Sequence, residues 1–180
     1  MHRMEAYFRL ALIFTAVLAI LYLPVLFYLK KRGKSIPRQV GYLGLICSLF
    51  LIAFATIFFT PITFQPETHT LNLIPFVWLG TGDDLYPLIV EKIPNVLLFI
   101  PLGFFLPAVF KGLRRFSKVA LVTFLTTFSI EFLQFFIGRS SDIDDVIANF
   151  LGGVIGYLAF RLCDRLFRSR RGWNSLLARC

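Results

Sequence analysis

Histidine and cysteine are scarce in this chain of 180 residues, which contains two histidines and three cysteines. His69 has no second histidine or cysteine nearby, so it is interpreted as a loop residue and not as a metal ligand. Cys47 lies within an apolar run, whereas Cys163 and Cys180 lie at or beyond the end of another run. This spacing predicts no disulfide bond, and the three residues are interpreted as packing residues or free thiols.

Charged residues are the second shortage, at 16% of the sequence, while hydrophobic residues make up 57% and the mean hydropathy is +0.75. Soluble domains have about 45 to 50% apolar residues, so this composition excludes a soluble globular protein. Because a membrane-spanning helix needs about 20 residues plus a connection, the chain has room for about four to six spans. The sequence predicts one membrane domain over residues 1–180 and no separate soluble domain.

Five long apolar runs are readable along the chain, at residues 6–29, 40–59, 94–110, 119–137 and 146–166. None has the alternating polarity of an outer-membrane barrel strand. A continuous apolar segment inside a bilayer must satisfy its backbone groups within itself, as a helix. The predicted fold class is therefore an all-α, polytopic integral membrane protein with about five transmembrane helices.

Basic residues are concentrated in three segments, residues 30–38, 111–118 and 161–179, which hold 15 of the 19 lysines and arginines. The alternating segments hold most of the acidic residues. Because positively charged loops stay in the cytoplasm, the N-terminus is expected outside and the C-terminus inside, with residues 167–180 as a basic cytoplasmic tail. The same charge suits contact with anionic lipid headgroups, and nucleic acid is not an expected partner.

The longest connection, residues 60–93, contains two apolar parts, residues 71–79 and 85–90. Phe76, Trp78 and Tyr86 are available there as anchors at the membrane interface. We expect both parts to lie on or dip into the outer membrane surface. They could form a lid or simply cover the helix ends.

Polar residues gather in the last third of the chain, on both sides of a short break around residues 138–142. One helical stripe of the fourth run and one of the fifth run are polar or small at helical spacing. The first stripe comprises Thr123, Thr127, Glu131, Gln134 and Gly138, and the second comprises Asp142, Asp145, Asn149, Gly152 and Gly156. The two stripes are expected to meet at the outer surface, with Glu131 roughly 9 Å below it, at about 1.5 Å per helical residue.

Each stripe also has an ordinary structural interpretation. Asp142 or Asp144 can cap the fifth helix and complement its dipole. The Gly152-x-x-x-Gly156 pattern is typical of closely packed helices. Glu131 needs a partner or a proton inside the bilayer, and Arg139 is the nearest cation in the sequence.

Several motifs, in their order and spacing, resemble the VanZ-like family. They are the segment Leu71 to Phe76, Asn95-x-x-x-Phe99-x-Pro101-Leu102-Gly103-Phe104, Glu131-x-x-Gln134, Gly138-Arg139-x-x-Asp142-Ile143-x-Asp145-Val146-x-x-Asn149, and Gly152-Gly153 through Gly156-Tyr157. The resemblance covers about residues 71–157. The two spans within residues 1–59 and the basic tail carry no comparable signature.

The resemblance implies a multi-pass protein of the bacterial cytoplasmic membrane, in a family whose namesake gives low-level resistance to the glycopeptide teicoplanin. The polar positions that match the family pattern are Asn95, Glu131, Gln134, Arg139, Asp142, Asp145 and Asn149. Asp144 is an additional acid in this chain. The expected partners are membrane lipids and a lipid-linked cell-wall precursor.

Three functions are compatible with these residues. The first is binding or shielding of a lipid-linked envelope component at the outer interface. The second is a metal-dependent enzyme acting on a lipid phosphate, in which Asp142, Asp144 and Asp145 hold Mg²⁺ or Ca²⁺. The third is a small transporter with Glu131 as a proton-coupled site. No Ser-His-Asp set, histidine-rich phosphatase motif or second acidic phosphotransferase motif is readable, which disfavours catalysis.

Overall fold

The computed structural model describes residues 2–58, 71–79 and 85–178, with side chains from residue 13 onwards. Five helices within these residues are long and apolar enough to cross a membrane, at Ile13–Lys31, Ile36–Ile57, Leu85–Val109, Phe116–Phe136 and Ile143–Phe167. The all-α fold class with five transmembrane helices is confirmed, and the protein is a multi-pass membrane protein. His69, interpreted above as a loop residue, lies outside the described residues.

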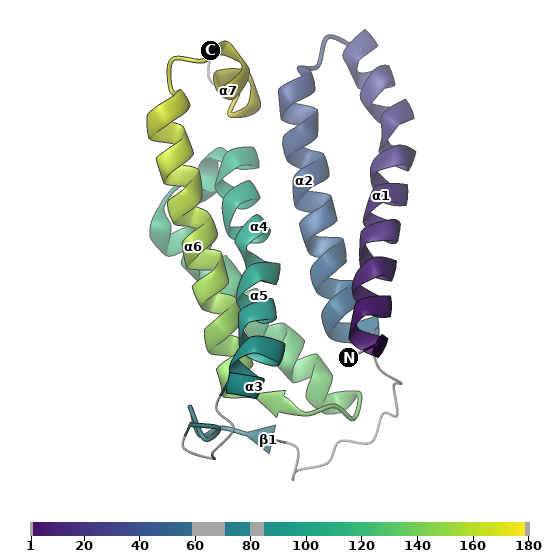
Figure 1. Cartoon of the computed structure of the whole chain (residues 1–180). Helices are drawn as coiled ribbons and strands as arrows, with labels where there is room; N and C mark the ends of the chain where they lie inside the picture. The colour runs from purple at the N-terminus through teal and green to yellow at the C-terminus, as the bar shows by residue number, and fades with distance from the viewer. Residues whose placement is uncertain (1, 59–70, 80–84, 179–180) are drawn as a thin grey trace.

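The described elements form a helical bundle with one small strand pair (Figure 1). In order they are α1 (His2–Lys31), α2 (Ile36–Ala53), η1 (Phe54–Phe58), β1 (Leu71–Asn72), α3 (Leu85–Pro87), η3 (Leu88–Lys92), α4 (Ile93–Val109), η4 (Lys111–Leu113), α5 (Phe116–Phe136), β2 (Ser141–Asp142), α6 (Ile143–Phe167) and α7 (Arg171–Leu176). The two strands pair in parallel, with Leu71 opposite Ser141 and Asn72 opposite Asp142. This pair fixes residues 71–79 to the break between α5 and α6.

The helix of the third span begins at Leu85 and not at Pro94, so residues 85–90, expected to lie on or dip into the membrane surface, are part of this helix. Pro87 is compatible with a helix here because it lies in the first turn, where its missing N–H has no partner to lose. Pro94 is preceded by the π-helical turn η3, in which the Ile93 amide donates to the Leu88 carbonyl. The helix therefore continues through both prolines into α4.

Helices α4 and α6 pack with their backbones in direct contact, because glycine lies at the crossing on both sides. A Cβ atom added at Gly152 or Gly156 would collide with the carbonyl oxygen of Val96 or Ile100, respectively. One added at Gly103 would collide with the backbone of Gly153. The predicted packing role of the Gly152-x-x-x-Gly156 pattern is confirmed.

Helix α4 is also the centre of the apolar core. Phe99, Leu102 and Leu106 of α4 are buried together with Leu45 and Ile52 of α2. Helix α1 lies at the edge of the bundle beside α2 (Figure 1). Outward-facing apolar side chains on the bundle, such as those of Leu21, Phe128 and Leu158, are 67%, 54% and 57% exposed, as expected of surfaces that meet lipid.

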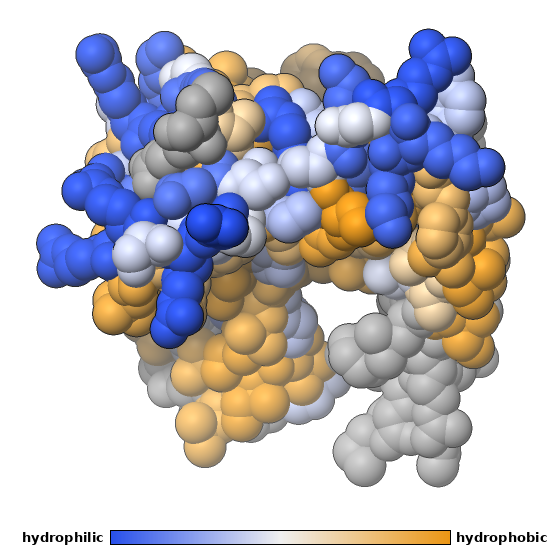
Figure 2. All heavy atoms as spheres, turned by 90° about the horizontal axis from the view of Figure 1, so that it is seen from above, coloured by the Kyte–Doolittle hydropathy of each residue, from blue (hydrophilic) through white to orange (hydrophobic). Residues whose placement is uncertain are grey.

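The two ends of the bundle carry different chemistry. The described basic residues of the three positive segments gather at one end, which Figure 2 shows from above as a largely hydrophilic face. The strand pair and the start of α6 lie at the opposite end (Figure 1). Which end faces the cytoplasm stays a prediction from the charge distribution.

The basic tail is partly folded instead of extending from the bundle. Helix α7 turns back against α2, and Leu177 after it is fully buried. The Arg114 side chain donates to the Leu177 carbonyl at 2.6 Å, and Trp173 donates from Nε1 to Asp164 at 2.9 Å. Residues 171–178 therefore close the basic end of the core.

The orientation can be tested by cysteine labelling in a variant in which Cys47, Cys163 and Cys180 are replaced. Ser117, Ser140 and Ser169 are exposed and suit single cysteine substitutions, whereas Ser141 is buried. We expect a membrane-impermeant maleimide to label Ser140→Cys in intact cells. Ser117→Cys and Ser169→Cys should react only after permeabilisation. The reverse pattern would place the acidic end of the bundle in the cytoplasm.

The close contact of α4 and α6 predicts a strong effect of one methyl group. Gly156→Ala should destabilise the protein by about 1 to 3 kcal/mol, the usual range for overpacking, because the helix backbones must separate. Thermal unfolding in detergent measures this effect. Gly172→Ala is the matched control, since nothing lies within 4 Å of an added Cβ there. Equal melting temperatures for the two variants would contradict the backbone contact.

Candidate functional site at the start of α6

The polar break between α5 and α6 is a capped turn. Gly138 has a φ of +82°, a left-handed conformation that glycine adopts without steric cost, and it follows the last turn of α5. Asp142 is the N-cap of α6, and its Oδ1 accepts a hydrogen bond from the Asp144 amide at 2.9 Å. The proposed capping role of Asp142 is confirmed. The acids in the first turn also complement the helix dipole.

Lys92 is the centre of the site, although none of the sequence motifs includes it. Its Nζ lies 3.1 Å from Asp142 Oδ2 and 2.8 Å from Asp145 Oδ1. The Lys92 side chain is 8% exposed, while those of Asp142 and Asp145 are 25% and 29% exposed. The ammonium group is therefore shielded, and the two carboxylates form the accessible edge of the pair. Charge-assisted bonds of this kind are among the stronger hydrogen bonds in proteins.

Lys92 is buried and is the last residue of the π-helical turn η3. A π turn inserts one extra residue into a helix. A second π turn, η1, lies at the end of α2, where the Thr56 carbonyl accepts hydrogen bonds from the side chains of both Gln134 and Arg139. The turn η3 thus contacts α6, and the turn η1 contacts the end of α5 and the break. Such turns occur frequently at functional sites.

Glu131 joins the site through the backbone of the break. Its Oε2 accepts a hydrogen bond from the Asp142 amide at 3.0 Å, and the side chain is buried with the residue 6% exposed. Burial lowers the pKa of the nearby Arg139 guanidinium, whereas the negative charges of Glu131 and Asp145 raise it. The pairing of Glu131 with Arg139 stays a prediction. We call Lys92, Glu131, Asp142 and Asp145 the acid–lysine cluster.

Asp144 contacts the backbone of residues 71–79 and not Lys92, unlike Asp142 and Asp145. Its two carboxylate oxygens accept from the Phe76 amide at 3.0 and 3.1 Å, and the residue is 4% exposed. Phe76 has a φ of +61°, which is rare for a bulky residue and is maintained here by that bond. Asn72 donates from Nδ2 to Asp142 Oδ1 at 3.1 Å. Both contacts hold residues 71–79 over the start of α6.

Besides Asp144, four predicted site residues are not members of the acid–lysine cluster, namely Asn95, Gln134, Arg139 and Asn149. Asn149 is 1% exposed, and its Nδ2 donates to Thr127 Oγ1 at 2.9 Å, inside the contact between α5 and α6. Its Oδ1 has no partner among the described residues. Asn95 is half-buried on α4, and its side chain makes no hydrogen bond within the part of the chain that the structure describes. The polar stripe of α5 is buried as predicted, with Thr123 and Thr127 at 1% and 0% exposure.

The residues considered for Mg²⁺ or Ca²⁺ do not fit such an ion in this arrangement. Lys92 lies between Asp142 and Asp145, where a cation would bind, and Asp144 is turned towards Phe76. Within residues 2–58, 71–79 and 85–178, no three histidine, cysteine, aspartate or glutamate side chains are grouped to hold a metal. Hard divalent cations need several oxygen ligands around one point.

The cluster suits a ligand that donates hydrogen bonds. Asp142 and Asp145 present partly exposed carboxylate oxygens, and the nearest ammonium is already shared between them. Hydroxyl and amide groups can donate to these oxygens. Beside them, residues 71–79 expose apolar side chains, with Leu73 and Ile74 at 67% and 68%. An acceptor-rich patch thus adjoins an apolar surface.

Comparison with known proteins agrees with the sequence motifs. The family model described as VanZ/LLP1 matches residues 40–164, a range that includes most of α2 and is wider than the motif region at residues 71–157. The chain is 33% identical over 140 residues to "Protein VanZ" of Enterococcus faecium, which covers 77% of this chain and 82% of that protein. No solved structure matches.

Lys92→Met should destabilise the protein because it leaves two carboxylates without their cation. We expect a loss of up to about 3 kcal/mol, the lower end for breaking a buried pair, since both aspartates are partly exposed. Thermal or denaturant unfolding in detergent measures the loss. Lys92→Met combined with Asp145→Asn should recover part of it, as one uncompensated charge is removed. Glu91→Gln is the control. Glu91 is also an acid near Lys92, but its side chain is 54% exposed and lies 3.6 Å from Lys92 Nζ, farther than the two aspartates.

A different result would change the interpretation of this contact. If Lys92→Met and Glu91→Gln unfold at the same temperature, the ion pair does not stabilise the start of α6. If the double variant is less stable than Lys92→Met alone, Asp145 has a stabilising partner other than Lys92.

Proposed function

The chain belongs to the VanZ/LLP1 family, and from this premise we propose that it binds a lipid-linked component of the bacterial envelope at the membrane surface and thereby shields it from teicoplanin. The binding site is the accessible edge of the acid–lysine cluster. The polar head of the ligand lies against Asp142 and Asp145, and its lipid part follows the apolar surface of residues 71–79. The orientation expected from the basic residues puts this end outside the cell.

The main support for the proposal is that two partly exposed carboxylates lie beside an apolar segment. Residues 71–79 are tied to the start of α6 by the strand pair and by the bond from Phe76 to Asp144. A ligand with a sugar or peptide head and a long hydrocarbon chain matches both halves of this surface. A water-soluble ligand would use only the carboxylates.

The same contacts give less support to the two alternative functions, an enzyme and a transporter. An enzyme acting on a lipid phosphate would need a divalent cation at the aspartates, where Lys92 already lies. In a proton-coupled transporter, the Glu131 carboxylate would have to lose its hydrogen bond as it becomes protonated. Here Glu131 accepts a hydrogen bond from the Asp142 amide and so stabilises the conformation of the break. Binding requires only that the acid–lysine cluster keep its present conformation.

In a susceptible Gram-positive host, the protein should raise tolerance to teicoplanin more than to vancomycin, because the lipid-tailed drug acts at the membrane surface. Asp145→Asn should abolish this effect. If unfolding caused the loss of tolerance, tolerance would follow stability. The double variant Lys92→Met/Asp145→Asn tests this, because it should be more stable than Lys92→Met alone and still give no tolerance. Minimum inhibitory concentrations, read beside membrane levels of each variant, measure the outcome. Glu91→Gln should protect like the parent.

Mass spectrometry of lipids retained after gentle purification tests the binding step directly. The parent and Glu91→Gln should retain a lipid-linked envelope component that Asp145→Asn loses. Retention by Asp145→Asn would show that the cluster is not the site. If the parent retains such a lipid but gives no tolerance, binding stands and the link to teicoplanin is wrong.

A further inference from the structure

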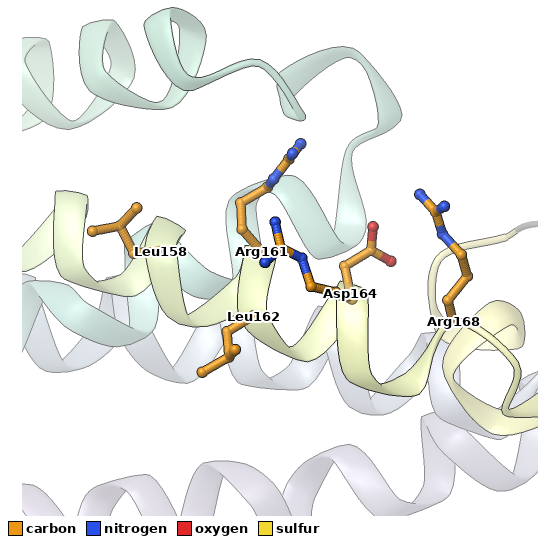
Figure 3. Close-up of a pocket in the computed structure, with 6 residues that line it drawn as sticks. Leu158, Arg161, Leu162, Asp164 and Arg168 are labelled. Carbon is orange, nitrogen blue, oxygen red and sulfur yellow. The ribbon is translucent and has the colours of Figure 1, made fainter.

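A recess of about 430 Å³ follows the last turns of α6, at the basic end of the bundle and far from the acid–lysine cluster. It is lined by Leu158, Arg161, Leu162, Asp164, Arg165 and Arg168 (Figure 3). The three arginines are spaced four and three residues apart, which places them on one face of the helix. All three are exposed, so the recess opens away from the protein core.

The sides of the recess differ in what they contact. Asp164 lies on the side of α7, is 8% exposed and accepts from Trp173 Nε1. Leu158 and Leu162 lie on the other side and are both 57% exposed, as lipid-facing residues are. The arginines lie between them. In the described part of the chain, none of the three makes a salt bridge.

The depth of the recess in a bilayer follows from the length of α6. The helix has 25 residues. At about 1.5 Å per residue it extends roughly 37 Å, more than the hydrocarbon thickness of about 30 Å. Its last turns therefore reach the headgroup region. Leu158 and Leu162 are then level with the acyl chains, and Arg165 and Arg168 are level with the phosphates. Arg161 lies beside Leu162, and its long side chain can extend to the same level.

We propose that this recess binds an anionic phospholipid of the leaflet at the basic end of the bundle. The phosphate lies among Arg161, Arg165 and Arg168, and one acyl chain follows Leu158 and Leu162. Arginine suits this role because its planar guanidinium can bind phosphate oxygens in a bidentate manner. A free phosphate would use the arginines but leave the leucine side empty. The inference does not depend on the proposed function, because it concerns the opposite end of the molecule.

Arg170 and Arg171 provide a matched control. They are also exposed and basic, but neither lines the recess. Replacing either pair of arginines by glutamine removes the same charge from the same end of the protein. A general attraction of anionic lipid to the basic end would respond equally to both replacements. A specific site would respond only to Arg161 and Arg165.

Native mass spectrometry of the full chain in detergent, titrated with phosphatidylglycerol, tests the proposal. We expect the parent and Arg170→Gln/Arg171→Gln to bind it alike. Arg161→Gln/Arg165→Gln should bind about thirtyfold more weakly, since each of the two removed cations contributes about 1 kcal/mol near a membrane surface and about 1.4 kcal/mol corresponds to a factor of ten. Phosphatidylcholine, and glycerol phosphate without acyl chains, should not bind at the same concentration. Equal weakening of both variants, or equal binding of both lipids by the parent, would overturn the site.

A second measurement does not depend on the variants inserting correctly. Phosphatidylglycerol with a photoreactive group in its acyl chain should crosslink the parent protein at the peptide that contains Leu158 and Leu162. Crosslinks confined to other spans would contradict the proposed position of the chain.

Discussion

The close contact between α4 and α6 determines where the other parts of the molecule lie. Glycine at Gly103, Gly152 and Gly156 allows the two backbones to touch, and the helices run in the same direction. Their N-terminal ends therefore meet at one end of the bundle. Lys92 precedes α4 and Asp142 precedes α6, so the packing deep in the membrane brings the lysine to the two aspartates at the surface. A separation of the helices would lengthen these contacts first.

The apolar runs and the polar stripes could be predicted from the sequence because both follow from helical periodicity and the cost of exposing polar groups to lipid. Glu131 and Gln134 are buried on the expected face of α5, and Asp142 caps α6. Lys92 could not be predicted in the same way. Pro87 and Pro94 made residues 85–93 resemble a loop, and a π turn leaves no periodic pattern that would show which way a side chain faces.

The three aspartates at the start of α6 illustrate why a cluster of acids is weak evidence for a metal. Each has a separate contact: Asp142 caps the helix, Asp144 holds the amide of Phe76, and Asp145 pairs with Lys92. Only the contact of Asp142 could be inferred from its position in the sequence. The contact of Asp144 joins residues 68 positions apart and places Phe76 in a left-handed conformation, so only a structure could show it.

The two ends of the bundle meet the membrane surface by opposite electrostatic means. At the start of α6, carboxylates at the accessible edge provide acceptors, and residues 71–79 provide the apolar contact. At the end of α6, arginines provide donors, and leucines on the same helix provide the apolar contact. Both arrangements place charge at the headgroup level and hydrocarbon beneath or beside it, as lipid molecules do. Since one helix carries both, a lipid bound at its basic end would fix the depth of α6 in the bilayer, and with it the height at which the acid–lysine cluster meets the opposite surface.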